Sequence, residues 1–364
     1  MKKVLIIGTT YIFGGVGRII FDLCKHIDRD KVEFDFLYYS DASIEEKKVI
    51  KELGGNFYLV PRYSRNPIHF LKYIKKFYRE HNYDWIHIHA STAMLLIYSL
   101  PVWKEENTKI IYHSHASYLD GGFNRILHRL LKPLVIKHSD IRLAVSKQAA
   151  TLMYGEGLNY ICLNNGIDTA KYCYDPKVRS NIRSQVGIED KYVIGNVGRF
   201  SVVKNHKFML KVFNKIYNKD NNTVLLLVGG GELEDEIRQE VKERKLEDSV
   251  IFYGTTNEVS KIFQVMDVFF LPSLWEAFPV AAIEAQAAGL PVVASTEISD
   301  EVAITPDFHN MDLNRDSIDV WADKLLSLKD SYNRTNKYEA IIQAGYDITT
   351  SADELKNIYI GDLA

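Results

Sequence analysis

The feature that most constrains the fold is a short, continuous apolar run followed by a glycine turn and a helix, and it occurs at two distant places. Near the start, Val4–Ile7 is wholly apolar, the turn Gly14-Gly15-Val16-Gly17 follows, and Arg18–His26 has apolar residues on one helical face. Tyr192–Val197 begins a second such unit. Runs without polar alternation are typical of parallel strands that helices cover on both faces.

The pattern continues after each start, so we expect an α/β protein of two doubly wound, Rossmann-like domains facing across a cleft. A length of 364 residues also suggests two domains, because single cores stop growing near roughly 250–300 residues. The predicted domains are 1–170 and 171–345, with a helix in 346–364 returning to the first. Residues 166–190 are polar and turn-rich, and we interpret them as the linker. Further predicted strands are Phe34–Tyr38, Trp85–Ile88, Lys109–Tyr112, Thr223–Val228, Ile251–Tyr253, Val268–Leu271 and Pro291–Ala294.

Composition narrows the class of protein. The chain is 46% hydrophobic and 25% charged, which is typical of a globular protein and not of a disordered one. Its three cysteines form no Cys-x-x-Cys pair, so free thiols in a reducing cytoplasm are the simplest interpretation. The longest apolar stretch, 93–103, is shorter than the roughly 20 residues that span a bilayer. We therefore expect a cytoplasmic protein that is soluble or peripheral to a membrane, and no nucleic-acid partner.

Two segments follow predicted strands and carry residues suited to phosphate. Gly14 and Gly15 let the backbone approach an anion at a helix N-terminus, although their spacing is not the Gly-x-Gly-x-x-Gly of dinucleotide sites, and a plain tight turn fits as well. Gly198-Arg199-Phe200-Ser201-Val202-Val203-Lys204 places Arg199 and Lys204 past a strand end. Two cations there can hold a diphosphate. The alternative for them is a solvated basic loop.

The segment 271–295 contains the most specific motif. Glu276 precedes a predicted helix, and Glu284 lies inside it among alanines and apolar residues. A carboxylate on an apolar helix is costly unless it has a partner, and sugar or ribose hydroxyls are natural partners. The alternative is an internal ion pair with an arginine or lysine.

His113-Ser114-His115 directly follows the predicted strand Lys109–Tyr112. Strand ends of α/β domains hold functional groups, and alternation places the two imidazoles on one side. A metal pair is conceivable, but no third ligand with a suitable spacing stands out, so we expect no metal site.

Taken together, these motifs resemble glycosyltransferase family 4, the retaining enzymes of the GT-B fold, over nearly the whole chain. The hallmark of that family is two glutamates separated by seven residues and followed by Ala-x-Ala-x-Gly-x-Pro-Val, which Glu276, Glu284 and 285–293 match. Gly198–Lys204 matches the pattern Gly-Arg-x-Ser-x-x-Lys, and Asn165-Gly166-Ile167-Asp168 matches the segment before the linker. His-Ser-His is similar to bacterial capsular and exopolysaccharide members. Ala277 departs mildly from the Gly or Ser that is frequent in the family.

The resemblance implies that 1–170 is the acceptor-side domain and that 171–345 binds the nucleotide sugar, and it implies a role for each matching residue. Arg199 and Lys204 would bind the donor diphosphate, Glu284 the ribose hydroxyls, and Glu276 the donor sugar. The backbone around Phe278, Pro279 and Val280 would line the same pocket. From the other domain, Gly15 would approach the phosphates and His115 the reacting sugar, with His113, Gly14 and Asn165 as further candidates.

The implied reaction is retaining transfer of a hexose-type sugar, with UDP-sugar as the expected donor, to a glycan or lipid-linked acceptor in surface polysaccharide biosynthesis. No cofactor and no metal are expected, since no convincing Asp-x-Asp site is present. Alternatives are a nucleotide-sugar epimerase of the same architecture, a non-catalytic nucleotide-sugar-binding subunit and, less in keeping with the glycine spacing, a dehydrogenase.

The two halves of the chain differ in charge. Residues 1–170 have 23 basic against 17 acidic residues, and 171–364 have 22 against 30. Segments 61–81 and 121–138 are predicted amphipathic helices with basic faces, so we expect the first domain to face an anionic membrane surface.

Overall fold

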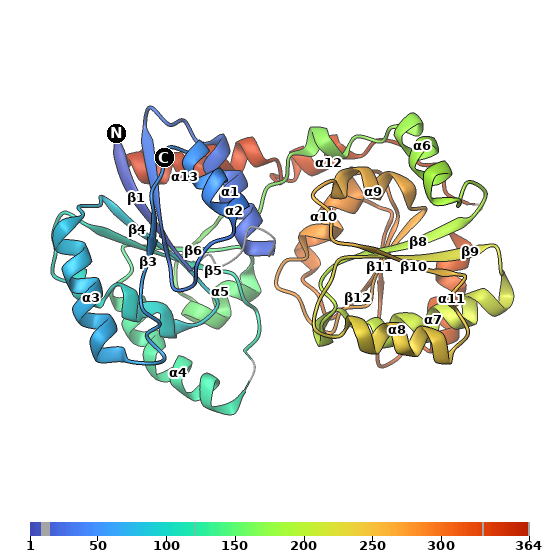
Figure 1. The fold of residues 1–364 in the computed structure, drawn as a ribbon, viewed down its shortest axis with the longest axis horizontal. Helices are drawn as coiled ribbons and strands as arrows, with labels where there is room; N and C mark the ends of the chain where they lie inside the picture. Colours follow the sequence, from blue (N-terminus) through green and yellow to red (C-terminus); the bar gives the residue numbers. More distant parts are fainter. Residues whose placement is uncertain (9–14, 120, 330, 363–364) are drawn as a thin grey trace. The chain divides into compact units, whose positions relative to one another are not determined.

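The chain folds into two compact α/β units. A computed structural model describes residues 1–8, 15–119, 121–329 and 331–362. One unit comprises Met1–Gly166 together with Asp347–Ala364, and the other comprises Ile167–Tyr346. Each unit is a parallel sheet between helices, so the predicted fold class of two doubly wound domains is confirmed (Figure 1).

The N-terminal unit contains a seven-stranded sheet in the order β3-β2-β1-β4-β5-β6-β7. Its strands are β1 (Lys2–Ile7), β2 (Val32–Tyr38), β3 (Phe57–Leu59), β4 (Trp85–Ala90), β5 (Lys109–Ser114), β6 (Ile141–Ala144) and β7 (Ile161–Cys162). Its helices are α1 (Gly15–His26), α2 (Ile44–Glu52), α3 (Pro67–Glu80), α4 (Gly122–Lys137), α5 (Lys147–Tyr154), α13 (Ile348–Ile360) and the 3₁₀ turns η1 (Ala93–Tyr98) and η2 (Leu100–Val102).

The C-terminal unit contains a six-stranded sheet in the order β10-β9-β8-β11-β12-β13. Its strands are β8 (Tyr192–Val197), β9 (Thr223–Val228), β10 (Val250–Gly254), β11 (Val268–Leu271), β12 (Val292–Ser295) and β13 (Phe308–Met311). Its helices are α6 (Pro176–Val186), α7 (His206–Lys219), α8 (Glu234–Glu243), α9 (Val259–Val265), α10 (Val280–Ala287), α11 (Ile318–Ser327), α12 (Tyr338–Gln343) and the 3₁₀ turns η3 (Thr169–Tyr172), η4 (Val202–Lys204) and η5 (Asp300–Val302).

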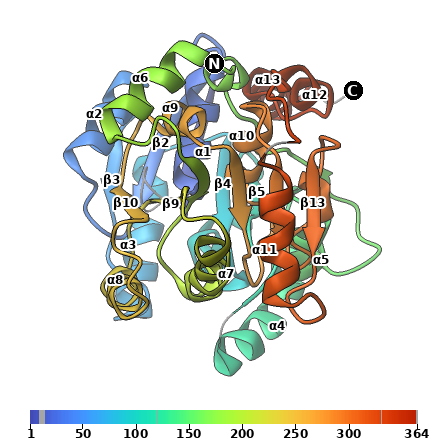
Figure 2. The same ribbon diagram turned by 90° about the vertical axis from the view of Figure 1, so that its right-hand side faces the viewer.

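Alternate side chains of the central strands pack into two separate hydrophobic cores, one on each face of the sheet. In β8, Val193 packs into the core beneath α9 and α10, whereas Tyr192 and Ile194 pack into the core with α7, α8 and α11. Figure 2 shows α7, α8 and α11 on one side of this sheet. Both faces are therefore apolar, which explains why the strands read as continuous apolar runs.

Strand order reverses once in each sheet. Chain order runs outward from β1 to β3 and then returns to β4 beside β1, and it runs outward from β8 to β10 and returns to β11 beside β8. Such reversals leave room between the loops that follow the two neighbouring strands, and ligands of doubly wound sheets bind there.

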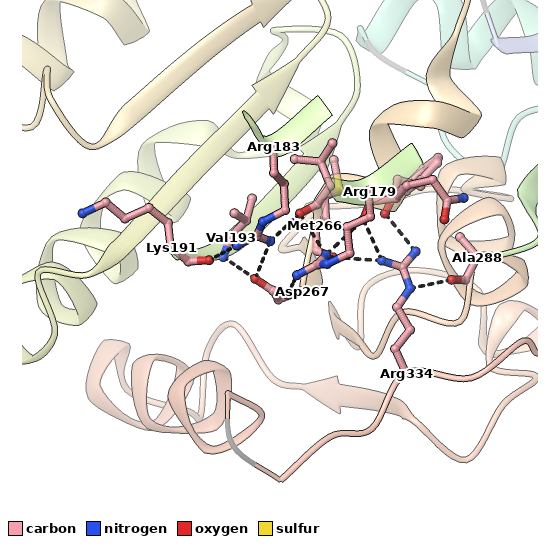
Figure 3. Close-up of polar contacts among 11 residues, drawn as sticks. Arg179, Arg183, Lys191, Val193, Met266, Asp267, Ala288 and Arg334 are labelled. Atoms are coloured by element: carbon pink, nitrogen blue, oxygen red, sulfur yellow. Dashed lines mark hydrogen bonds and ion pairs between the residues drawn. The ribbon is translucent and has the colours of Figure 1, made fainter. Parts of the chain in front are cut away.

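The interpretation of the polar segment 166–190 as a linker is wrong, because residues 167–190 fold as part of the C-terminal unit. The segment contains α6, which begins with Pro176 after the N-cap Asp175 and ends at Gly187 in the left-handed region. Its two arginines reach Asp267: Arg179 by an ion pair, and Arg183 with its Nη1 3.2 Å from Oδ2 (Figure 3). The segment is polar because these side chains satisfy groups at the amino end of β11.

Another arginine, Arg334, joins the C-terminal part of this unit to the segment just before β11. Arg334 donates through Nη1 to the carbonyls of Gln264 and Met266, both at 3.0 Å, and through Nε to the carbonyl of Ala288 at 2.8 Å (Figure 3). Backbone carbonyls that the sheet and α9 leave unpaired are satisfied in this way.

The last helix belongs to the N-terminal unit. α13 packs against α1, as Figure 1 also shows, and Tyr359 lies buried on the sheet. The indole Nε1 of Trp85 donates to the carbonyl of Tyr359 at 2.8 Å. Among the described helices, none combines the length and apolar character needed to cross a bilayer.

We predict that Asp267→Asn lowers the free energy of unfolding by about 3 kcal/mol, because it removes the negative charge that two partly buried arginines share. Asp267 also accepts from the backbone N–H of Val193 at 2.7 Å, so its role is central to α6 and β8 together. Urea unfolding followed by circular dichroism measures the change.

The matched control is Asp323→Asn, which breaks an exposed ion pair with Lys219. Exposed pairs contribute roughly 0–1 kcal/mol, so this variant should unfold almost as the wild type does. Equal losses in the two variants would contradict the role given to Asp267.

Candidate functional site

The loops after β8 and β11, where the strand order of the C-terminal sheet reverses, are joined to each other. The backbone N–H of Leu274 donates to the carbonyl of Val203 at 2.8 Å, and Asn205 Nδ2 donates to the carbonyl of Pro272 at 3.1 Å. Asn205 has a φ of 56°, in the left-handed region that asparagine tolerates, and α7 begins at the next residue. These contacts fix the Arg199–Lys204 segment over the end of the sheet.

Gly198 lies directly beneath the side chain of Lys204. A Cβ at residue 198 would lie 2.9 Å from Cε and 3.2 Å from Cδ of Lys204. The lysine stem therefore runs across the glycine, which explains the spacing between Gly198 and Lys204. Gly231, in the turn after β9, is equally close, because its Cβ would lie 2.5 Å from the carbonyl oxygen of Phe200.

Lys204 and Glu276 form a mostly buried ion pair. The ammonium donates to Oε1 at 2.8 Å and to Oε2 at 2.7 Å, and the two side chains are 14% and 15% exposed. Ser273 Oγ, from the end of β11, donates to Oε1 at 2.5 Å. An ammonium has three N–H donors, so this geometry leaves Lys204 with one for an anionic ligand.

Arg199 is held much more loosely. Its side chain is 73% exposed and pairs with Glu232, which is 52% exposed, at 2.9 Å. An ion pair this exposed contributes roughly 0–1 kcal/mol, so a phosphate can take the guanidinium from Glu232 at little cost.

α10 presents its N-terminus beside the ion pair. Pro279 is the N-cap, Val280 is the first helical residue, and the proline side chain makes no capping hydrogen bond. Phe278 packs on Tyr346 with ring centroids 5.3 Å apart. The first N–H groups of a helix carry partial positive charge and bind anions.

Glu284 lies on the same helix and is 5% exposed. The Tyr172 hydroxyl, from η3, donates a hydrogen bond to Glu284 Oε1. Tyr172 is a site residue that the sequence did not indicate, because it lies in the segment interpreted as linker. Ser273 was missed as well, although the run Leu271-Pro272-Ser273 at a strand end signals its position.

The remaining candidates belong to the N-terminal unit. His115 is half-buried just past β5, His113 is buried on β5, and Asn165 is buried after β7. Gly15 begins α1 at the amino end of that helix, whereas Gly14 lies outside the described residues. His115 Nε2 lies 2.9 Å from His89 Nδ1 of β4. His89 and His87 were missed, and their signal was the His-x-His pattern in Trp85–Ala90.

Two family matches together extend over most of the chain. Residues 178–347 match the family described as glycosyl transferases group 1, and residues 13–171 match glycosyltransferase family 4. The boundary between the two matches lies close to the division between the structural units.

Individual relatives agree with these matches. The chain is 28% identical to the putative glycosyltransferase EpsF of Bacillus subtilis, over 98% of this chain and 96% of that protein. It is 24% identical to the UDP-Gal:alpha-D-GlcNAc-diphosphoundecaprenol alpha-1,3-galactosyltransferase of Escherichia coli, over 83% of each chain. Among solved structures, Anabaena HepE in complex with UDP and glucose superimposes with a TM-score of 0.82 at 18% identity, over 100% of both chains. The last similarity shows that the fold is GT-B, as expected.

We predict that His206 makes the stability of the C-terminal unit depend on pH. His206 is buried against Phe200, with ring centroids 4.5 Å apart, and burial together with the charge of Lys204 lowers its pKa from 6.5 to about 4. His206 is therefore protonated below about pH 6.5 in the unfolded chain, but only below about pH 4 in the folded chain. The free energy of unfolding falls as pH decreases through this window, by about 2 kcal/mol at pH 5 from this residue.

The measurement is urea unfolding of wild type and His206→Gln at pH 7 and pH 5. The variant should lose about 2 kcal/mol less than wild type between the two conditions. The same loss in both proteins would show that His206 is not the titrating group.

Proposed function

Because the chain belongs to glycosyltransferase family 4, we propose that it is a retaining, metal-independent hexosyltransferase that uses a UDP-sugar in the biosynthesis of a surface polysaccharide. The observation that carries the proposal is the buried Lys204–Glu276 pair beside the N-terminus of α10. It combines a fixed cation, a fixed carboxylate and helix N–H groups at the reversal point of a doubly wound sheet.

The cations suit the leaving group. When a nucleotide-sugar bond breaks, negative charge develops on the diphosphate, and cations already fixed in place stabilise it most. Lys204 is fixed by Glu276, and Arg199 supplies a second, adaptable cation with forked N–H donors. The backbone N–H groups of Phe278 and Val280, around Pro279, add the helix dipole.

The carboxylates suit hydroxyl groups. Glu284 is proposed to accept from the ribose hydroxyls, with Tyr172 holding one of its oxygens in place. Glu276 is proposed to lie beside the donor sugar. His115 and Gly15 are proposed to contact the substrate from the N-terminal unit, and His113, Gly14 and Asn165 remain secondary candidates.

Transfer with retention is proposed to occur on one face of the sugar. The bond from the anomeric carbon to the diphosphate oxygen breaks as the acceptor oxygen bonds to that carbon from the same side. The acceptor proton passes to the leaving phosphate oxygen. In this scheme the charge on the diphosphate is balanced by Arg199 and Lys204, and no metal ion is needed for the reaction.

A lipid-linked acceptor is proposed because the Escherichia coli relative is named for a substrate on diphosphoundecaprenol. Helix α4 gives a physical reason to expect the membrane surface. Its exposed side carries Phe123 (76% exposed), Ile126, Leu130 (67%) and Leu134, three or four residues apart. Such spacing places them in one stripe.

Charge on α4 favours an anionic surface. Arg125, Arg129 and Lys137 are exposed, and residues 121–139 contain no aspartate or glutamate. α3 differs, because its apolar residues Phe70, Ile74 and Phe77 are buried, and only Ile68 and Tyr73 are exposed among its lysines and arginines. We therefore propose α4, with its longer exposed apolar stripe, as the helix that enters the lipid interface, with α3 contributing mainly charge.

We predict that a UDP-sugar raises the melting temperature of the wild type, since a ligand at 100 times its dissociation constant stabilises the folded protein by roughly 2.7 kcal/mol.

We also predict that Lys204→Met reduces transfer on the order of 100-fold at subsaturating donor, because a charged contact is worth about 2–4 kcal/mol. Lys207→Met is the matched control, since Lys207 is an exposed lysine on α7 paired with Glu236.

The assay supplies a panel of nucleotide sugars with a polyprenyl-diphosphate-linked sugar and separates the products. A new glycosidic product supports transfer. An altered nucleotide sugar without acceptor would identify an epimerase, and binding without turnover would identify a binding subunit. Near wild-type activity in a folded Lys204→Met protein would remove Lys204 from the site.

We predict that the protein sediments with anionic vesicles at low salt, and less at high salt, because each lysine or arginine near the surface contributes about 1 kcal/mol. Changing Phe123 and Leu130 together to serine should reduce binding further than changing Lys72, Lys75 and Lys76 of α3 together to glutamine. The membrane proposal fails if the wild type partitions equally onto neutral and anionic vesicles, or onto neither.

A further inference from the structure

Four histidines gather on one face of the N-terminal sheet. His87 and His89 alternate along β4, while His113 and His115 alternate along β5 and past its end, and the parallel register places His89 opposite His113. Ring centroids lie 4.0 Å apart for His87 and His89 and 5.4 Å apart for His87 and His113. One ring nitrogen from each of His87, His89 and His113 lies within 4.8 Å of the other two.

The nitrogens of this cluster lack partners. Nε2 of His87, Nε2 of His89 and both ring nitrogens of His113 are buried, and within the described part of the chain they accept and donate no hydrogen bond. The three side chains are at most 4% exposed. Native proteins rarely leave buried polar atoms unsatisfied, so several in one cluster indicate a ligand among them.

The opposite nitrogens are held in place. His87 Nδ1 lies 2.6 Å from the hydroxyl oxygen of Tyr359 on α13, and His89 Nδ1 lies 2.9 Å from His115 Nε2. When these Nδ1 atoms carry the proton, the Nε2 lone pairs of His87 and His89 are free. A histidine bound to a metal typically donates its other N–H to a neighbouring group in this way, which fixes the tautomer and the ring.

We propose that His87, His89 and His113 bind a divalent transition-metal ion, with Zn²⁺ as the ion best suited to the ligands. Imidazole nitrogens suit Zn²⁺, Cu²⁺ and Ni²⁺, whereas Mg²⁺ and Ca²⁺ require oxygen ligands that this cluster does not offer. Metal–nitrogen bonds of about 2.0–2.1 Å require the three nitrogens to lie closer together than the 4.8 Å that now encloses them, so the rings would close around the ion on binding.

The surroundings favour the ligating form of each ring. Burial, as the largest cause, lowers the pKa of all three imidazoles, that of His87 to about 3, so they are neutral at pH 7. Neutral imidazole is the form that binds metals. The ion would tie β4 to β5 inside the N-terminal unit, a structural role separate from the proposed metal-independent transfer.

The test measures metal content and stability. The wild-type protein, expressed with added zinc and purified without chelator, should hold about one Zn²⁺ per chain by inductively coupled plasma mass spectrometry. Protein reconstituted with Co²⁺ should show the visible absorption bands of a nitrogen-ligated site. Zn²⁺ should raise the melting temperature of the metal-free protein.

His113→Phe is the sharpest variant, because neither ring nitrogen of His113 has a partner among the described residues. It should lose the ion and the shift in melting temperature caused by Zn²⁺, while its metal-free form melts at or above the temperature of metal-free wild type. His89→Gln should also lose the ion. His69→Gln, at an exposed histidine of α3, is the matched control and should retain both.

Two outcomes overturn the proposal. One is wild-type protein that holds less than about one tenth of an equivalent of Zn²⁺ or Co²⁺ under both preparations. The other is a folded His113→Phe protein that retains as much metal as the control, which would assign the ion to surface histidines. Neither outcome affects the transfer assay, so this proposal and the proposed function fail separately.

Discussion

Coverage of parallel sheets on both faces is the constraint on which the rest of the structure depends. With mostly apolar residues on each side of a strand, polar side chains reach solvent chiefly where strands end, and a parallel sheet places all its carboxyl ends along one edge. The loops after β8 and β11 therefore carry the polar groups, and the reversal of strand order between them provides the space. Gly198 and Asn205 are adjustments that let one loop carry a lysine stem across its own backbone.

Groups with local signals were predictable from the sequence. Continuous apolar runs predicted the strands and hence the fold. A strand-end position indicated Lys204, and a predicted apolar helix indicated Glu276 before it and Glu284 inside it; the structure places all three in one unit with side-chain partners. Partners from distant segments were not predictable, because they depend on tertiary packing. Tyr172 reaches Glu284 across 112 residues, and Arg179 reaches Asp267 across 88, so the polar segment that contains them looked like a linker.

The same limit explains the two basic helices and the histidines. α3 and α4 have similar amphipathic sequences, yet the sheet buries the apolar side of one and leaves much of that side of the other exposed. Composition cannot distinguish them, because the difference lies in what each helix packs against. The sequence suggested His113 with His115 and no third ligand, whereas the structure brings His113 beside His87 and His89 of the adjacent strand, whose pairing the sequence does not state.

Both sheets bury polar groups beside the points where their strand order reverses, but the desolvation cost of those groups is offset in different ways. In the C-terminal unit the groups are charged, and Lys204 and Glu276 neutralise each other while Ser273 fixes the carboxylate. Taking one partner from such a pair is expensive, so an anionic ligand has to add to the pair and not replace it, which the third N–H of Lys204 permits. In the N-terminal unit, Gly8 lets the end of β1 approach the carbonyl of His89 closely. The polar groups beside it are neutral imidazoles, and burying them is costly because several of their ring nitrogens make no hydrogen bond within the described part of the chain. A charged pair is complete without a ligand, whereas a cluster of unpaired lone pairs is not, and for this reason we propose the metal among the histidines and not at the proposed diphosphate site.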